Sequence, residues 1–164
     1  MLGAFRVVKA RRACVQALHP FVARPQMLGP WPPQFWRDPF VIGFVTYVIG
    51  TVTKLVTRGK LNTEQRGRVL IGTLKDVGAP PNFIDQVQAL SQARHPDFML
   101  GGRNAETVIT YVMNMHPMPG DPDVATATEL AKGTTLTGTV GRDEIGGSLM
   151  HMLFTQVVQK RLGV

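Results

Sequence analysis

Apolar side chains recur every three or four positions through most of this chain, in segments separated by proline and glycine. This spacing is typical of amphipathic helices. The most apolar segment, residues 40–57, follows Asp38-Pro39 and precedes Gly59. Aspartate favours the N-cap, proline the first helical position and glycine the residue after a helix, so we expect one helix between these signals.

Similar signals divide the rest of the chain. Asn62 with Gln65 forms a capping-box pattern, and Asn104, which follows a glycine pair, is expected to cap a separate helix. The further predicted helices cover residues 63–77, 82–94, 105–115, 122–133 and 142–162. The last of them is predicted to bury Ile145, Leu149, Leu153 and Val157. We therefore predict an all-α fold, a compact bundle of five or six helices.

Residues 4–18, ahead of this bundle, also fit a helix. Its predicted apolar stripe consists of Phe5, Val8, Val15 and Leu18, interrupted by Arg12. His19-Pro20 is expected to end the helix, because proline disfavours helical backbone in the residue before it.

Charge separates this first helix from the later ones. Residues 1–37 contain no Asp or Glu and six basic side chains: Arg6, Lys9, Arg11, Arg12, Arg24 and Arg37. The other twelve Lys and Arg face eleven Asp and Glu, so most of the formal charge of +7 belongs to the N-terminal segment. We predict a basic N-terminal arm, residues 1–37, joined to a nearly neutral helical bundle domain, residues 38–164.

The arm ends in a connector rich in proline and tryptophan, residues 29–36. Its three prolines within four residues favour an extended backbone. Two interpretations of Trp31, Phe35 and Trp36 stay open. In the first, these rings pack the connector onto the body, which would remove a large apolar surface from water. In the second, they form an aromatic belt that binds a membrane interface or a partner.

The helix over residues 40–57 has one branched apolar face and one face of small residues. The small residues are Gly43, Thr46, Gly50, Thr53 and Thr57. Small side chains let another backbone approach, from this chain or a second copy, so Gly43 and Gly50 are predicted helix-packing positions. Alternatively, the threonines simply face solvent. The uncharged stretch of fourteen residues is shorter than the roughly 20 that a bilayer span needs, which favours a core helix over a transmembrane one.

The sequence contains no recognisable catalytic or metal-binding motif. Cys14, the one cysteine, excludes an internal disulfide and is expected to be a small buried side chain rather than a reactive thiol. Met and His side chains within residues 113–118 and 150–152 suit Cu(I), but methionine commonly fills cores. The Thr/Gly-rich residues 134–142 suit an anion, but two carboxylates follow directly. We expect no catalytic residue, metal or cofactor.

These patterns predict a non-enzymatic helical interaction or accessory module. Its predicted partner-binding residues are Arg6, Lys9, Arg11, Arg12, Arg24, Trp31, Trp36 and Arg37. The expected partner is an acidic protein surface or an anionic membrane, and the protein is expected to be a homo-oligomer or a subunit of a larger assembly. The alternative is a nucleic-acid-binding protein that uses the Arg-rich arm, with the helical body as its dimerisation unit.

The expected location is the cytoplasm, with possible association at the membrane periphery. The single cysteine and the lack of a continuous apolar secretory signal favour it. An Arg-rich start without acidic residues also resembles a transit peptide, so the alternative location is mitochondrial.

Overall fold

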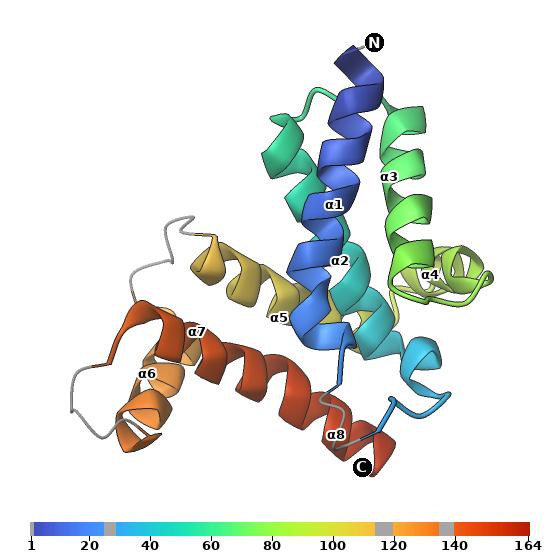
Figure 1. The fold of residues 1–164 in the computed structure, drawn as a ribbon. Helices are drawn as coiled ribbons and strands as arrows, with labels where there is room; N and C mark the ends of the chain where they lie inside the picture. The colour runs from blue at the N-terminus through green and yellow to red at the C-terminus, as the bar shows by residue number, and fades with distance from the viewer. Residues whose placement is uncertain (1, 25–28, 114–119, 135–139) are drawn as a thin grey trace. The chain divides into compact units, whose positions relative to one another are not determined.

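The computed structural model describes residues 2–24, 29–113, 120–134 and 140–164, and these residues form helices joined by turns, with no strand among them. The predicted all-α class is therefore confirmed (Figure 1). Two compact units divide the chain, residues 1–102 and residues 103–164. The expected division at residue 37 rests on charge and does not coincide with this boundary, because the N-terminal helix belongs to the first unit.

The helices can be followed along the chain in Figure 1. The first unit contains α1 (Leu2–Val22), a 3₁₀ turn (Phe35–Arg37), α2 (Pro39–Thr57), α3 (Thr63–Asp76), α4 (Phe83–Gln92) and the start of α5 (Pro96–Val112). The second contains the rest of α5, then α6 (Pro122–Thr134), α7 (Arg142–Met150), a π-helical turn (His151–Thr155) and α8 (Gln156–Leu162). The α7 helix, the π-helical turn and α8 are continuous and count as one helix. The described residues therefore form seven helices, close to the expected number.

The core of the first unit is built around α2. The Asp38 carboxylate accepts hydrogen bonds from the amides of Phe40 and Val41, at 2.9 and 3.3 Å, which fixes the start of the helix. Arg58 and Gly59 end it in the left-handed region, with φ of 53° and 70°. Residues 40–45 are all buried, because neighbouring helices of the same unit surround this part of α2.

In the described part of the chain, α2 is the one helix long and apolar enough to cross a membrane. It has 19 residues, and 61% of its most apolar 18-residue window is buried inside the protein. The core helix of a globular protein meets the same length and composition criteria. These two properties alone therefore do not identify a membrane span.

Along its length α1 packs against both α2 and α3 (Figure 1). The buried side chains of α1 are Ala10, Cys14, Leu18 and Phe21. This face differs from the predicted stripe, because Phe5 and Val8 are exposed. The small side chains of Ala10 and Cys14 let the helix approach both neighbours closely, so they occupy the contact and the larger residues do not.

The predicted end of α1 at His19-Pro20 was also wrong, since the helix continues for two more residues. Pro20 lacks an amide hydrogen and costs the helix one hydrogen bond. Packing offsets this loss. Phe21, one residue later, is only 4% exposed, and its ring lies 4.8 Å from the ring of Phe44.

A second correction concerns α5, which begins at Pro96 and runs through the glycine pair that was expected to precede a new helix at Asn104. A glycine pair commonly interrupts a helix, because glycine has low helix propensity. Here a tertiary contact explains the glycine. A Cβ on Gly101 would lie 2.9 Å from the carbonyl carbon of Phe40, so only glycine fits.

The reciprocal contact comes from α2. A Cβ on Gly43 would lie 2.8 Å from the carbonyl carbon of Phe98, at the start of α5. Both helices thus have glycine where their backbones cross. In contrast, Gly50 has no neighbouring atom within 4 Å of such a Cβ.

The second unit is built around the continuous helix over residues 142–162, as the sequence predicts. Its π-helical turn holds one more residue per turn than an α-helix, so the buried face shifts by one position. After Leu149 and Leu153 the buried residues are Phe154 and Val158, while the predicted Val157 is only half-buried. Asn104, expected as a helix cap, instead donates its side-chain amide to the Leu153 carbonyl, at 2.8 Å.

Candidate functional site

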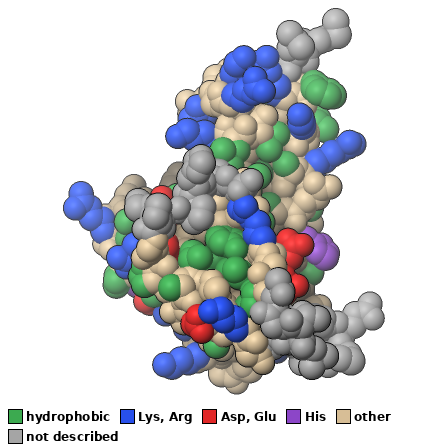
Figure 2. Space-filling model, turned by 90° about the vertical axis from the view of Figure 1, so that its left-hand side faces the viewer, with side chains coloured by type: hydrophobic (Ala, Val, Ile, Leu, Met, Phe, Trp, Pro, Cys, Tyr) green, Lys and Arg blue, Asp and Glu red, His purple; other side chains and the backbone are tan. Residues whose placement is uncertain are grey.

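Charge is distributed unevenly between the two units. Residues 1–102 contain 13 Lys and Arg and 5 Asp and Glu, a formal charge of +8, whereas residues 103–164 contain 5 and 6, a formal charge of −1. In the uppermost part of Figure 2, Lys and Arg side chains gather and no Asp or Glu is visible. The basic surface therefore extends beyond the N-terminal arm.

Three helix ends meet at this basic region, as Figure 1 shows: the start of α1, the end of α2 and the start of α3. The exposed basic residues on these segments are Lys9, Lys54, Arg58, Lys60, Arg66 and Arg68, which we call the basic end. The acidic side chain among these segments is Glu64, which forms an ion pair with Arg68 at 2.6 Å. The fold thus adds α2 and α3 residues to the charge that the sequence places on α1.

The outer face of α1, defined by Phe5, Val8, Lys9 and Arg12, combines exposed apolar and basic side chains. These positions recur at helical spacing and therefore share one side of the helix. Phe5 is 70% exposed and Val8 is 49% exposed, while Arg6 is half-buried beside them. Among the large hydrophobic side chains that the structure describes, Phe5 is the most exposed.

Arg11 is a predicted partner-binding residue that has a partner within the chain. Its Nε and Nη2 atoms donate to the Asp76 carboxylate of α3, both at 2.5 Å. This bidentate hydrogen bond lowers the pKa of Asp76 and raises that of Arg11. The pair joins α1 to α3 and removes one cation from the surface available to a ligand.

The connector packs onto the first unit through a row of aromatic rings. The Trp31 ring stacks on Phe35 at 4.8 Å, and Phe35 meets Trp36 edge to face at 5.0 Å. Trp36 in turn contacts Phe83 at the start of α4, at 6.0 Å. Both tryptophans are half-buried and Phe35 is fully buried, so this contact anchors the connector.

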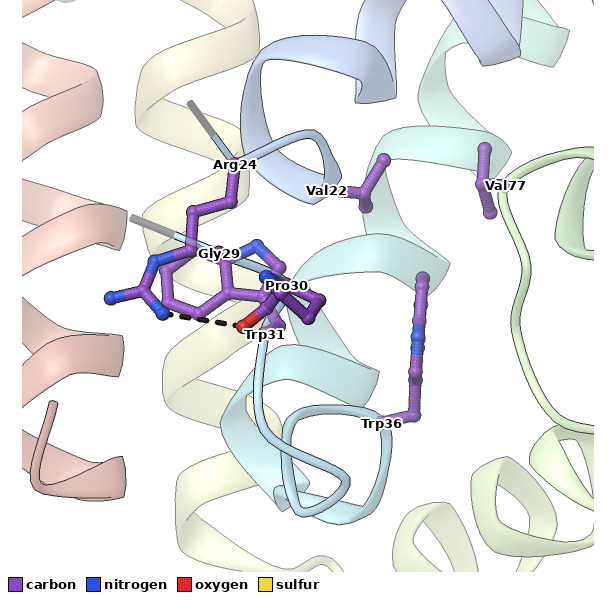
Figure 3. Close-up of a pocket in the computed structure, with 7 residues that line it drawn as sticks. All are labelled: Val22, Arg24, Gly29, Pro30, Trp31, Trp36 and Val77. Carbon is purple, nitrogen blue, oxygen red and sulfur yellow. Dashed lines mark hydrogen bonds between the residues drawn. The ribbon is translucent and has the colours of Figure 1, made fainter. Parts of the chain in front are cut away.

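A cleft of about 520 Å³ lies beside this connector (Figure 3). Its lining residues include Arg24, whose guanidinium lies 4.8 Å from the Trp31 ring centroid and donates to the Pro30 carbonyl at 3.3 Å. Trp36, another lining residue, lies on the right in Figure 3, away from Arg24. Arg37 is exposed. Two predicted partner-binding residues, Arg24 and Trp31, thus contact each other.

Cys14 is buried where α1 meets α2. Its thiol donates to the Ile49 carbonyl at 3.6 Å and lies 3.4 Å from the Thr53 hydroxyl. Burial raises the pKa of the Cys14 thiol, although the contact with Thr53 acts in the opposite direction. A protonated, enclosed thiol is a poor nucleophile, which agrees with the structural role expected from the sequence.

No group of three or more His, Cys, Asp and Glu in the described residues could hold a metal ion. Within the Met- and His-containing segments, residues 114–118 lie outside the described residues, and His151 is exposed. Residues 135–139 of the Thr/Gly-rich segment also lie outside them.

The sequence did not reveal the convergence of Lys54, Arg58 and Lys60 with α1, because the pairing of helices depends on tertiary packing. The run of basic residues after α2 was the available signal.

In comparisons with protein-family models, curated proteins and solved structures, the chain has no match.

Proposed function

We propose that this protein is a non-enzymatic interaction module that binds an anionic membrane through the outer face of α1. The observation that carries the proposal is the exposure of Phe5 and Val8 beside Lys9 and Arg12. Helices that lie in a membrane interface combine an apolar surface with basic side chains. In this proposal the protein is cytoplasmic and peripheral to the membrane.

The expected affinity can be estimated from these side chains. Full burial of such a residue contributes about 1.5–3 kcal/mol, so the exposed fractions of Phe5 and Val8 together give about 2–4 kcal/mol. Each cation near an anionic surface adds about 1 kcal/mol, or about 3 kcal/mol for Arg6, Lys9 and Arg12. A total of about 5–7 kcal/mol corresponds to weak, reversible association.

Vesicle co-sedimentation tests the proposal directly. The protein is expected to sediment with vesicles that contain phosphatidylserine and to stay in solution with phosphatidylcholine alone. A double F5S/V8S variant should bind at least tenfold more weakly, and K9Q/R12Q about 30-fold more weakly from the loss of about 2 kcal/mol. Equal binding of the wild type and both variants would refute the proposal.

A matched control is available on α3. Ile71 is 61% exposed but lies off the outer face of α1, so I71S removes one exposed apolar side chain elsewhere on the first unit. This variant should retain full vesicle binding. Weakening by I71S as strong as that by F5S/V8S would show that general surface hydrophobicity, rather than this face, drives association.

Nucleic-acid binding is the second candidate, favoured by the formal charge of +8 on residues 1–102. Neutralising about five or six phosphates predicts a slope near −4 to −5 in a plot of log affinity against log salt. The F5S/V8S variant would leave this affinity unchanged, since it keeps every cation. A flat salt response would exclude this candidate.

A further inference from the structure

A groove of about 560 Å³ lies between α2 and α3, within the size range of small-molecule sites. Every residue that lines it is described, and all come from these helices or the turn between them: Thr46, Ile49, Gly50, Thr53, Lys54, Gly59, Thr63, Arg66, Gly67 and Leu70. None of them belongs to the outer face of α1. The groove is therefore a separate feature from the proposed membrane surface.

Two glycines keep this groove open. A Cβ added to Gly50 of α2 or Gly67 of α3 would meet no atom within 4 Å. Ile49 and Leu70 supply apolar walls. The row of small residues on α2 thus has two roles, since Gly43 contacts α5 and the segment from Thr46 to Thr53 lines the groove.

The charged side chains that line the groove are both cationic. Lys54 is exposed and forms no ion pair among the described residues. Arg66 is held in place by its bonds to the carbonyls of Leu61, at 3.0 Å, and Gly59, at 3.5 Å. An apolar channel with cations and no lining carboxylate is complementary to a molecule with an apolar chain and an anionic head.

One residue that lines the groove, Thr46, has a polar atom without a partner among the described residues. The Thr46 hydroxyl oxygen is shielded from solvent and makes no hydrogen bond among the described residues. Buried hydroxyls are normally hydrogen-bonded, and leaving one unpaired is unfavourable. The shielded oxygen is out of reach of a ligand as well, so the apolar walls and the two cations are the groups that a ligand in the groove would contact.

We propose that this groove binds a single-chain amphipathic carboxylate, with the acyl chain against Ile49 and Leu70 and the carboxylate near Lys54 and Arg66. This inference goes beyond the membrane proposal, because it assigns a small-molecule ligand to a different face. Inorganic phosphate alone would leave the apolar walls in contact with water. The favoured ligand therefore has both a chain and a negative charge.

Isothermal titration calorimetry with dodecanoate, kept below its micelle-forming concentration, tests the proposal on the full chain. Saturable binding is expected for dodecanoate and not for dodecylammonium, which has the same chain and the opposite charge. Equal binding of the two ligands, or binding of neither, would overturn it. F5S/V8S should bind dodecanoate like the wild type, so a failure of the membrane proposal is distinguishable from a failure here.

Substitutions in the groove locate the site. Gly50→Leu fills the open space and should weaken dodecanoate binding at least tenfold, whereas Gly133→Leu, at another open glycine in α6, should not. Lys54→Gln should weaken binding, and Arg103→Gln, outside the groove, should leave it unchanged. Unchanged binding by a folded Gly50→Leu variant, judged by circular dichroism, would overturn the assignment. Gly67→Leu provides the same test from α3 if Gly50→Leu does not fold.

Discussion

Two glycine-to-alanine substitutions in the same helix should change stability in opposite directions. At Gly43 the new methyl group would overlap the backbone of α5, whereas at Gly50 it would enter open space. Alanine is favoured over glycine inside a helix by about 0.8–1.0 kcal/mol, and this gain applies to both positions. Only Gly43→Ala must also separate two packed helices.

The magnitudes follow from these two terms. Overpacking typically costs about 1–3 kcal/mol, so Gly43→Ala should lose up to about 2 kcal/mol after the gain in helix propensity. Gly50→Ala should gain about 0.5–1 kcal/mol. With a urea dependence of about 2 kcal/mol per molar, the two midpoints should differ by about 1 M.

Tryptophan fluorescence during urea unfolding is the appropriate assay. Both tryptophans, Trp31 and Trp36, lie within residues 1–102, so the signal reports the unit that contains the crossing. Gly101→Ala, on the α5 side, should be destabilised like Gly43→Ala. Equal midpoints for Gly43→Ala and Gly50→Ala would refute the close crossing.

Three further predictions concern the ion pair, the cysteine and the π-helical turn. The Arg11–Asp76 pair lowers the pKa of Asp76 below its ordinary 3.8. The contribution of the pair to the free energy of unfolding is therefore present above that pH and is lost as the pH falls through the folded-state pKa. In urea unfolding, D76N should be less stable than the wild type at neutral pH and equal to it in strong acid. Cys14 should react with Ellman's reagent slowly in the native protein and rapidly in urea, and rapid native labelling would contradict its burial. Asn104→Ala should lower the thermal midpoint through the loss of about 1 kcal/mol, since it leaves the Leu153 carbonyl without this donor; an unchanged midpoint would contradict that role.

The features that the sequence predicts well depend on neighbouring residues. Asp38 caps α2, and Asn62 with Gln65 forms both hydrogen bonds of the capping box at the start of α3. Such signals act within one helical turn, so they are readable without knowing the fold. The helix class and most helix positions follow from them together with apolar spacing.

The features that the sequence does not predict depend on contacts between distant segments. Ala10 and Cys14 are less apolar than Phe5 and Val8, yet they form the buried face of α1, because close packing favours small side chains there. Gly101 resembles a helix break until the α2 backbone is placed beside it. The exposure of Phe5 and Val8 has the same origin, since the apolar pattern alone assigns both to a packed stripe, whereas the sequence already marks Lys9 and Arg12 as partner-binding residues.

The π-helical turn gives the C-terminal helix an unusual tolerance to a change in chain length. Each residue of an α-helix advances the side chains by about 100°, so deleting one residue normally rotates all later positions away from their contacts. Deleting Thr155, a half-buried residue of this turn, would instead convert the turn to α-helix and leave Val158 four positions after Leu153, still on the buried face. The same deletion in α2 would misplace every core residue beyond it. The C-terminal helix and α2 thus differ sharply in whether they can accept the deletion of one residue.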